Sequence, residues 1–329
     1  VVVKPAEDAP LTPLALAKLA LEAGIPAGVI NVVTGYGPEA GAAVPAHPGI
    51  RRVGFTGSPA TGRAIMEACA RNLTPLHLEL GGKSPQVVFP DADLDAAIPQ
   101  MTFSITLNTG QVCAAGSRVV VHRSIHDEVV ERLAAQMQQV TVGPWHEPVN
   151  MGPLVNAKQY ERVLGYIRLG REAGAELVTG GGAPDGLENG FFVEPTLFDQ
   201  VAPDMRIARE EIFGPVMSVI TVGDEEEAVE KYDAAKAIGN AAHRILIGRG
   251  KEIAPGDFPN WWSRVGFRVL VVPFQRAWHR LAYLRLRRIG GAEGLRPVPR
   301  SSRLLHVGPE LPGPGIWSMS REHFVRTEA

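Results

Sequence analysis

The pattern of hydrophobic and polar positions changes once along the chain. From residue 1 to about residue 240, short β-branched runs alternate with amphipathic stretches. Short apolar runs predict buried strands, and a 3.6-residue period predicts helices. The first part of the pattern predicts strands at 1–3, 29–33, 52–55 and 76–80, separated by helices at 12–23, 39–44 and 60–71. Strands and helices that alternate at this spacing are typical of a parallel, doubly wound sheet.

The same pattern continues in a second α/β segment. It predicts strands at 87–89, 118–122, 192–197 and 216–222, helices at 127–140 and 158–173, and a loop over 180–190. Residues typical of helix ends support two of the helices. Thr12 and Pro13 suit an N-cap and a first helical position, with Gly24 as the stop. Ser124 and Asp127 are spaced like a capping box. We expect two α/β domains, over residues 1–81 and 82–235.

This alternation is lost after about residue 235. Residues 241–329 carry 15 Lys and Arg against 6 Asp and Glu, whereas residues 1–240 carry 18 against 29. Apart from a short apolar run at 267–272 and a basic stretch at 278–288, neither a strand nor a helix period persists. A divergent domain would account for residues 236–329. We favour a segment not selected for this fold, such as out-of-frame translation of a GC-rich message, because it is rich in Arg, Pro, Gly and Trp.

Composition narrows the class of protein. The formal net charge is −2 and 45% of the 329 residues are hydrophobic, so the chain can build two cores and has no overall basic character for nucleic acid. No apolar run approaches the roughly 18 residues that span a bilayer. Two cysteines cannot form a disulfide framework, which is typical of a reducing compartment. We expect a cytoplasmic protein without a nucleic-acid or membrane partner.

Two strand-to-helix turns are rich in glycine. Gly35, Gly37 and Gly41 follow the strand expected at 29–33, and Gly57 and Ser58 follow the next strand. Glycine lets the backbone approach a dinucleotide, and the N-terminus of the following helix attracts phosphate. Ordinary turn chemistry explains either cluster by itself, but two such turns in one βαβ region favour a nucleotide site.

One carboxylate and one thiol have surroundings that suit catalysis. Glu79 ends an apolar strand before two glycines, where burial would raise the pKa of its carboxyl toward that of a general base. A strand end that faces solvent is the alternative for Glu79. Cys113 lies among glycines and small residues outside any expected helix or strand, which suits a reactive thiolate. Cys69 lies in mid-helix, where a free cysteine is an ordinary buried hydrophobe.

Together these segments closely resemble the aldehyde dehydrogenase superfamily. The match covers roughly residues 1–225, in five motifs that follow the family's order and spacing. The motifs are Lys4-Pro5-Ala6-Glu7, Phe55-Thr56-Gly57-Ser58, Glu79-Leu80-Gly81-Gly82-Lys83, Gly110-Gln111-Val112-Cys113 and Glu211-Ile212-Phe213-Gly214-Pro215. The resemblance implies an α/β fold, with a Rossmann-like dinucleotide-binding domain and an α/β catalytic domain, incomplete at both ends. It also implies an NAD(P)-dependent enzyme that oxidises an aldehyde to a carboxylic acid.

The resemblance assigns roles to residues. Cys113 is expected to add to the aldehyde carbon, and Glu79 to activate the water that hydrolyses the thioester left after hydride transfer. Glu7 is expected at the adenosine ribose, where it favours NAD over NADP, although NADP stays open. No metal is expected. The expected cofactor contacts are Lys4 and Glu7 at the ribose, Gly57 and Ser58 at the pyrophosphate, Glu211 and Phe213 at the nicotinamide end, and Gly35, Gly37, Gly41, Gly62 and Leu80.

Three features depart from the family pattern. The chain begins at Val1–Val3, in mid-strand and without methionine or signal peptide, so we expect a fragment. The family's oxyanion-hole asparagine and the hairpin for subunit contacts would lie upstream, although the family is homo-oligomeric. The family's later glycine-rich motif and last strands are unrecognisable after about residue 235. Because losing an oxyanion donor typically costs on the order of 100- to 1000-fold in rate, we expect this chain alone to be inactive or nearly so.

Two other functions stay open at this point. A catalytically silent nucleotide-binding fragment or scaffold would share the fold without turnover. A relative that passes the acyl group to coenzyme A, or reduces an acyl phosphate, often lacks the base, so Glu79 argues against it. The sequence does not name the aldehyde; residues near Phe103, Leu107 and Val112 are expected to line its site.

Overall fold

The computed structural model describes residues 1–228 and 245–247. All described residues belong to one compact unit of the chain. The run predicted at 267–272 and the basic stretch at 278–288 lie outside the described residues. Domain boundaries at residues 81 and 235 stay predictions.

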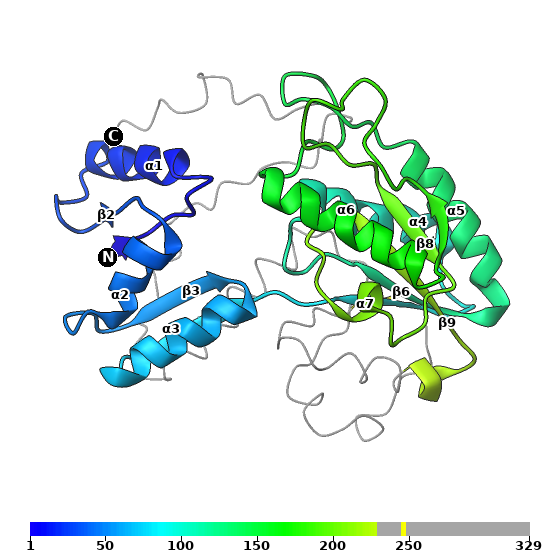
Figure 1. The fold of residues 1–329 in the computed structure, drawn as a ribbon, viewed down its shortest axis with the longest axis horizontal. Coiled ribbons are helices and arrows are strands. Elements are labelled where there is room, and N and C mark those ends of the chain that lie inside the picture. Colours follow the sequence, from blue (N-terminus) through cyan, green and yellow to red (C-terminus); the bar gives the residue numbers. More distant parts are fainter. Residues whose placement is uncertain (229–244, 248–329) are drawn as a thin grey trace, which may run out of the picture. The chain divides into compact units, whose positions relative to one another are not determined.

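The first eighty residues form two small parallel sheets with short helices between the strands (Figure 1). The first sheet pairs β1 with β2, and the second pairs β3 with β4. The elements in order are β1 (Val2–Val3), α1 (Leu11–Glu22), β2 (Asn31–Val32), the π-helical turn η1 (Gly37–Gly41), α2 (Ala42–Ala46), β3 (Val53–Gly57), α3 (Pro59–Arg71) and β4 (Leu76–Leu80).

A six-stranded sheet follows, in the order β10-β5-β6-β9-β8-β7. All neighbouring strands are parallel except β7 and β8, which are antiparallel. Its strands are β5 (Pro85–Val88), β6 (Arg118–His122), β7 (Glu176–Thr179), β8 (Thr196–Asp199), β9 (Val216–Val222) and β10 (Ile245–Ile247). The connecting helices are α4 (Leu94–Thr106), η2 (Leu107–Gly110), η3 (Arg123–Ile125), α5 (His126–Gln138), α6 (Ala157–Glu172) and α7 (Arg206–Arg209).

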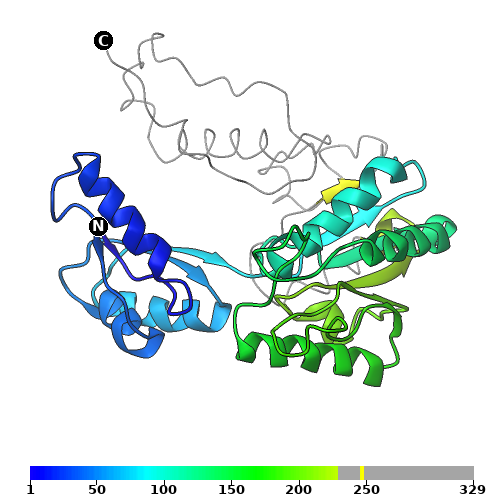
Figure 2. The same ribbon diagram turned by 90° about the horizontal axis from the view of Figure 1, so that it is seen from above.

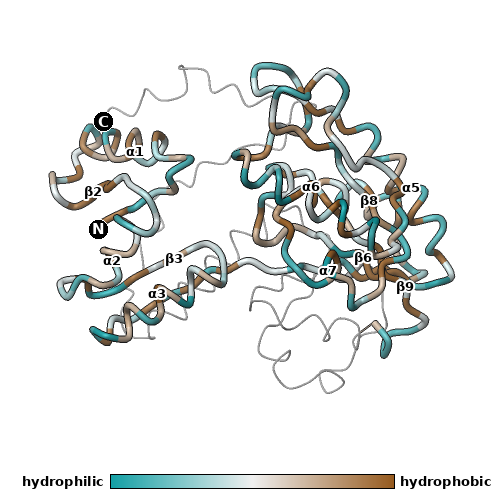
Figure 3. The backbone as a smooth tube through the Cα atoms, in the orientation of Figure 1, coloured by the Kyte–Doolittle hydropathy of each residue, from teal (hydrophilic) through white to brown (hydrophobic). Residues whose placement is uncertain are grey.

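Helices cover both faces of this sheet (Figure 2). Met101 of α4 and Leu133 of α5 pack with Val219 of β9 on one face. Ile167 of α6 packs with Ile220 on the other. Adjacent residues of β9 therefore enter opposite cores, as the two-residue period of a strand requires. Burial on both faces explains why β6 and β9 are predominantly apolar, with brown stretches in this part of Figure 3.

Several predicted elements match and others need correction. The strands at 76–80, 118–122 and 216–222 are confirmed. The predicted helix at 39–44 is instead the turn η1 followed by α2, and the strand predicted at 192–197 begins only at Thr196. The strand predicted at 29–33 is only Asn31–Val32 and is not buried. Val29 is 46% exposed and Val33 is 43% exposed.

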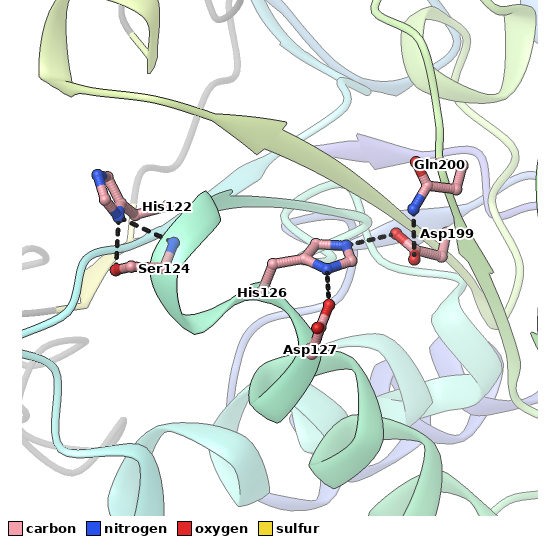
Figure 4. A network of polar contacts seen from close by, with 6 residues as sticks. All are labelled: His122, Ser124, His126, Asp127, Asp199 and Gln200. Carbon is pink, nitrogen blue, oxygen red and sulfur yellow. Dashed lines mark hydrogen bonds and ion pairs between the residues drawn. The ribbon is translucent and has the colours of Figure 1, made fainter.

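Both predicted N-caps were wrong. Helix α1 begins one residue before Thr12, with Pro10 at the N-cap and no side-chain cap. Helix α5 begins at His126, again without a side-chain cap. The Ser124 hydroxyl instead lies 2.8 Å from Nδ1 of His122 (Figure 4). A hydroxyl near a helix start forms whichever local hydrogen bond its backbone geometry allows, so spacing alone did not identify the cap.

The start of α5 is tied to the end of β8 by a buried histidine. His126 Nε2 lies 2.9 Å from the Asp199 carboxylate, and its Nδ1 lies 2.7 Å from Asp127 (Figure 4). Burial lowers the pKa of His126, but the hydrogen bonds to Asp127 and Asp199 outweigh it, and the pKa is raised. The pair therefore joins a helix and a strand that are 73 residues apart.

Candidate active site

Cys113 lies in a turn between η2 and β6, outside any helix or strand, and is partly exposed. Cys69 is 2% exposed within α3, where burial raises the pKa of its thiol. The predicted contrast between the two cysteine environments is therefore confirmed. Cys113 is positioned for access by solvent or a small molecule, and Cys69 for packing.

The backbone before Cys113 adopts an uncommon conformation. Asn108, Thr109 and Gly110 all have left-handed φ angles, of +50°, +58° and +69°. Thr109 is β-branched and therefore strained there, but its hydroxyl donates to the Gly152 carbonyl at 2.9 Å. The Gln111 side chain donates to the Asn108 carbonyl at 3.1 Å and accepts from the Val155 N–H at 2.9 Å. These contacts fix the loop that presents Cys113.

The Cys113 loop contacts the segment that contains Glu211 and Phe213. A Cβ atom on Gly110 would lie 2.2 Å from the carbonyl oxygen of Gly214, which no side chain could tolerate. Only glycine permits this approach, and it also permits the positive φ at this position. Phe213 itself has a φ of +61° and is 37% exposed.

Glu211 reaches back to the turn after β4. Its Oε1 accepts a 3.3 Å hydrogen bond from the Gly82 N–H. A Cβ on Gly81 would lie 2.0 Å from the same carboxylate, so Glu211 rests directly on the Gly81 backbone. Burial raises the pKa of Glu211, although the Gly82 N–H and the charges of Arg162 and Lys83 oppose the rise. Three motifs far apart in sequence, around residues 81, 110 and 213, thus lie in contact.

Lys83 follows this turn and is buried, at 5% exposure. Its Nζ has no hydrogen-bond partner within the described part of the chain. Burial and the nearby Arg118 lower the pKa of Lys83 to about 7, against the charge of Glu211, which raises it. The amine therefore titrates near neutral pH beside Glu211.

Glu79 lies on β4, as predicted, and its side chain is 39% exposed. Its Oε1 is 3.0 Å from Nε2 of His77, two residues earlier on the same face of the strand. The carboxylate is thus neither fully buried nor a freely solvated strand end.

The residues expected at the adenosine ribose lie together. Lys4 and Glu7 form a 3.2 Å ion pair. A hydrogen bond from its own backbone N–H, and then Lys4, lower the pKa of Glu7 and keep it ionised. The Lys4 side chain also passes Gly41, 3.8 Å from where a Cβ would be. Glu7 and Gly35 line one pocket of about 210 Å³.

Gly35 and Gly37 bound the turn after β2. Gly35 has a φ of +146°, and a Cβ there would lie 2.8 Å from Ala40. Gly37 is the first residue of η1. The backbone conformation and the close approach of Ala40 therefore require glycine at position 35, and the cofactor contacts of Gly35 and Gly37 stay predictions.

Residues of the second glycine turn also stabilise the fold. Gly57 ends β3, and Ser58 is the N-cap of α3, accepting a 3.2 Å hydrogen bond from the Thr61 N–H. Gly62 packs against Leu80, whose Cδ2 would be 2.9 Å from a Cβ on the glycine. Helix capping and helix–strand packing thus account for Ser58, Gly62 and Leu80 in part, and their cofactor contacts stay predictions.

Sequence reasoning missed a group of residues on α6 that hold the Glu211 segment. Gln159 donates to the carbonyls of Ile212 and Phe213, at 3.0 and 2.8 Å. Arg162 donates to the carbonyls of Glu211 and Ile212. Their spacing on one helix face was visible in the sequence, but their partners lie about fifty residues further along the chain.

Comparison with known proteins identifies the fold. The aldehyde dehydrogenase family model matches residues 1–243. The chain is 52% identical over 221 residues to hydroxyisobutyraldehyde dehydrogenase of Mycolicibacterium austroafricanum, covering 67% of this chain and 44% of that protein. It is 48% identical over 231 residues to betaine aldehyde dehydrogenase of Brucella ovis, covering 69% and 47%. The chain therefore spans a little under half the length of these relatives.

Solved structures agree. The NAD-dependent aldehyde dehydrogenase of Sinorhizobium meliloti matches with a TM-score of 0.69 at 46% identity, over 71% of this chain and 46% of that one. The NAD⁺ complex of the Bacillus cereus aldehyde dehydrogenase matches with a TM-score of 0.69 at 43% identity, over 75% and 54%. These features define an α/β dehydrogenase fold with an accessible cysteine loop. The chain belongs to the aldehyde dehydrogenase family.

Within 1–228 and 245–247, no helix combines the length and apolar character that a membrane span needs. The same residues contain no cluster of three or more His, Cys, Asp or Glu that could hold a metal ion.

Proposed function

We propose that this chain carries the catalytic cysteine, the general base and most cofactor contacts of an NAD-dependent aldehyde dehydrogenase. One observation carries the proposal: the Cys113 loop, the Gly81–Gly82 turn and the Glu211–Gly214 segment are in contact. A reactive thiol, a strand-end carboxylate and a nicotinamide-binding segment are the parts that this reaction needs in one place.

The residues present fit NAD at both ends. At the adenosine end, ionised Glu7 and the Gly35 turn border one pocket, so a ribose hydroxyl could donate to the carboxylate. Between the two ends, Ser58 is the N-cap of the thirteen-residue helix α3, whose N-terminus favours a pyrophosphate. At the nicotinamide end, Glu211 presents a carboxylate held by the Gly82 N–H. Glu7 would repel a 2′-phosphate, so NAD is favoured over NADP.

Cys113 performs the first chemical step. Its thiolate adds to the aldehyde carbon and gives a tetrahedral thiohemiacetal. The hydrogen bonds of Gln111 and Thr109 hold the loop still during this addition. NAD held at Glu7 and Glu211 would supply the hydride acceptor, and loss of hydride from the adduct would leave a thioester on Cys113.

Glu79 performs the second step. Its carboxylate takes a proton from a water molecule, whose oxygen attacks the thioester carbonyl. The carboxylic acid leaves, and Cys113 is restored as the thiolate. Partial exposure of Glu79 supports this role, because the proton that it accepts must then pass to solvent.

The test is NADH formation from a simple aldehyde by the protein that carries this chain. We expect turnover that depends on both aldehyde and NAD and that is abolished in Cys113→Ser. Cys69→Ser is the matched control, since it removes the other thiol, and it should retain activity. NAD binding without any acyl transfer to Cys113 would instead favour the catalytically silent alternative. The relatives named for hydroxyisobutyraldehyde and betaine aldehyde make small aliphatic aldehydes the first substrates to assay.

A further inference from the structure

We propose that Tyr166 and Glu210 form a positioning pair that fixes the Glu211–Phe213 backbone for NAD binding. The proposal rests on the proposed function, because it takes Glu211 as a cofactor contact. Tyr166 and Glu210 affect NAD binding by holding the Glu211–Phe213 loop. Neither residue belongs to the five sequence motifs.

Glu210 is held by three hydrogen bonds from two helices. The Tyr166 hydroxyl of α6 donates to Oε2 at 2.6 Å. Arg206 of α7 donates from Nε at 2.8 Å and from a terminal nitrogen at 2.9 Å. The Arg206 hydrogen bond, together with that of Tyr166, lowers the pKa of Glu210 to about 2 against the effect of burial. Glu210 is therefore an ionised anchor directly before Glu211 in the chain.

Tyr166 also positions the guanidinium that holds the next two carbonyls. Its ring lies 5.0 Å from Cζ of Arg162, a cation–π distance. The Tyr166 hydroxyl lies 3.4 Å from a terminal nitrogen of Arg162. That same nitrogen donates to the Glu211 carbonyl, and Arg162 Nε donates to the Ile212 carbonyl at 3.3 Å. The Tyr166 side chain thus contacts Glu210 and Arg162, two of the groups that hold the loop.

The loop needs such support because its own conformation is unfavourable. Phe213 has a φ of +61°, a region that non-glycine residues avoid. Glu211 must also keep its carboxylate directly against Gly81. A loop released from Glu210 would relax toward ordinary angles and carry Glu211 away from the Gly82 N–H.

The hydroxyl of Tyr166 can be removed without a cavity in the core. The residue is 6% exposed and packs in the apolar cluster with Val163 and Ile167. Tyr166→Phe keeps the ring in that cluster and deletes the hydrogen bond to Glu210. Tyr160→Phe is the matched control: it removes the same atom from the same helix, and the Tyr160 hydroxyl has no hydrogen bond within the described residues.

The experiment measures NAD affinity, the KM values for NAD and aldehyde, and the midpoint of thermal unfolding, in the protein that carries this chain. We expect Tyr166→Phe to weaken NAD binding about tenfold, because a hydrogen bond to a charged group commonly contributes at least that factor. The KM for NAD should rise with it while the KM for the aldehyde changes little. Tyr160→Phe should leave NAD binding unchanged.

A second variant guards against a simple folding defect. Glu210→Gln should also weaken NAD binding, and the double variant should lose less affinity than the two single losses combined, because the two residues share the Tyr166–Glu210 hydrogen bond. Equal NAD affinity in Tyr166→Phe and unaltered protein would overturn the positioning pair but leave the proposed function standing. A loss of NAD affinity that Tyr160→Phe also shows would likewise overturn the positioning pair and leave the proposed function standing. Failure of the unaltered protein to bind NAD would overturn both.

Discussion

The backbone N–H of Gly82 donates a 3.3 Å hydrogen bond to the Glu211 carboxylate, 129 residues later in the chain. Gly82 lies in the turn that directly follows the Glu79 strand, and Glu211 lies two residues before Phe213. The turn that holds Glu211, the expected nicotinamide contact, therefore directly follows the strand of Glu79, the proposed general base. A small change in that turn should therefore weaken cofactor binding more than it lowers the stability of the fold.

Gly81→Ala tests this dependence. Its new Cβ would lie 2.0 Å from the Glu211 carboxylate, so that the flexible end of Glu211 must move and lose its bond to Gly82. We expect NAD binding about tenfold weaker or more, with little change in the midpoint of thermal unfolding. Gly54→Ala in β3 is the control, because nothing lies within 4 Å of its Cβ position. An unchanged NAD affinity in Gly81→Ala would contradict the assignment of Glu211 to the cofactor.

The two cysteines should differ in reactivity. Cys113 lies in an accessible turn, whereas Cys69 is 2% exposed and burial raises the pKa of its thiol. Because alkylation requires an accessible thiolate, iodoacetamide near neutral pH should label Cys113 at least about tenfold faster. Peptide mapping by mass spectrometry after brief exposure measures the ratio. Equal or reversed labelling would remove the case for Cys113 as the nucleophile.

Glu7 should determine the choice of dinucleotide. Its ionised carboxylate repels a 2′-phosphate and accepts hydrogen bonds from free ribose hydroxyls. The unaltered protein should bind NAD more tightly than NADP. In Glu7→Gln the ratio of the two dissociation constants should fall to less than about tenfold. Glu22→Gln, which removes an exposed carboxylate from α1, should leave the preference as it is. Tighter binding of NADP by the unaltered protein would show that Glu7 does not select the cofactor.

His126 should make stability depend on pH. Hydrogen bonds to Asp127 and Asp199 raise its pKa above the ordinary 6.5, against the effect of burial. A raised pKa in the folded state contributes stability that is fully present below the unfolded pKa and is lost as pH rises through the folded one. His126→Gln should therefore lower the free energy of unfolding by about 1–3 kcal/mol below pH 6.5 and by less above it.

Urea unfolding at a series of pH values measures this effect. His146→Gln is the control, because the His146 side chain is 61% exposed and its Nε2 lies as far as 4.0 Å from Oε1 of Glu147. A stability difference for His126→Gln that grows from pH 6 to pH 8 would show that the neutral imidazole, not the charged one, is the stabilising form.

Local pattern predicted some elements and missed others for physical reasons. The strand at 216–222 was predictable because burial on both faces favours a predominantly apolar run of β-branched residues. The helix ends at Thr12 and Ser124 were not, since either hydroxyl can bond elsewhere. The candidate Cys113 and Glu79 could be predicted because short motifs surround them. The Tyr166–Glu210 bond could not, because its partners are 44 residues apart and only the fold brings them together.

The most direct test of the central claim traps the intermediate on Cys113. Glu79→Gln should still add an aldehyde and release hydride to NAD, since the base acts only afterwards, but hydrolysis should slow by about 100-fold or more. After mixing with aldehyde and NAD, mass spectrometry of the peptide that contains Cys113 should show the mass of the aldehyde less two hydrogens, with one equivalent of NADH. Without NAD the modification should be absent. Fast steady turnover in Glu79→Gln, or an acyl group on any residue other than Cys113, would contradict the account.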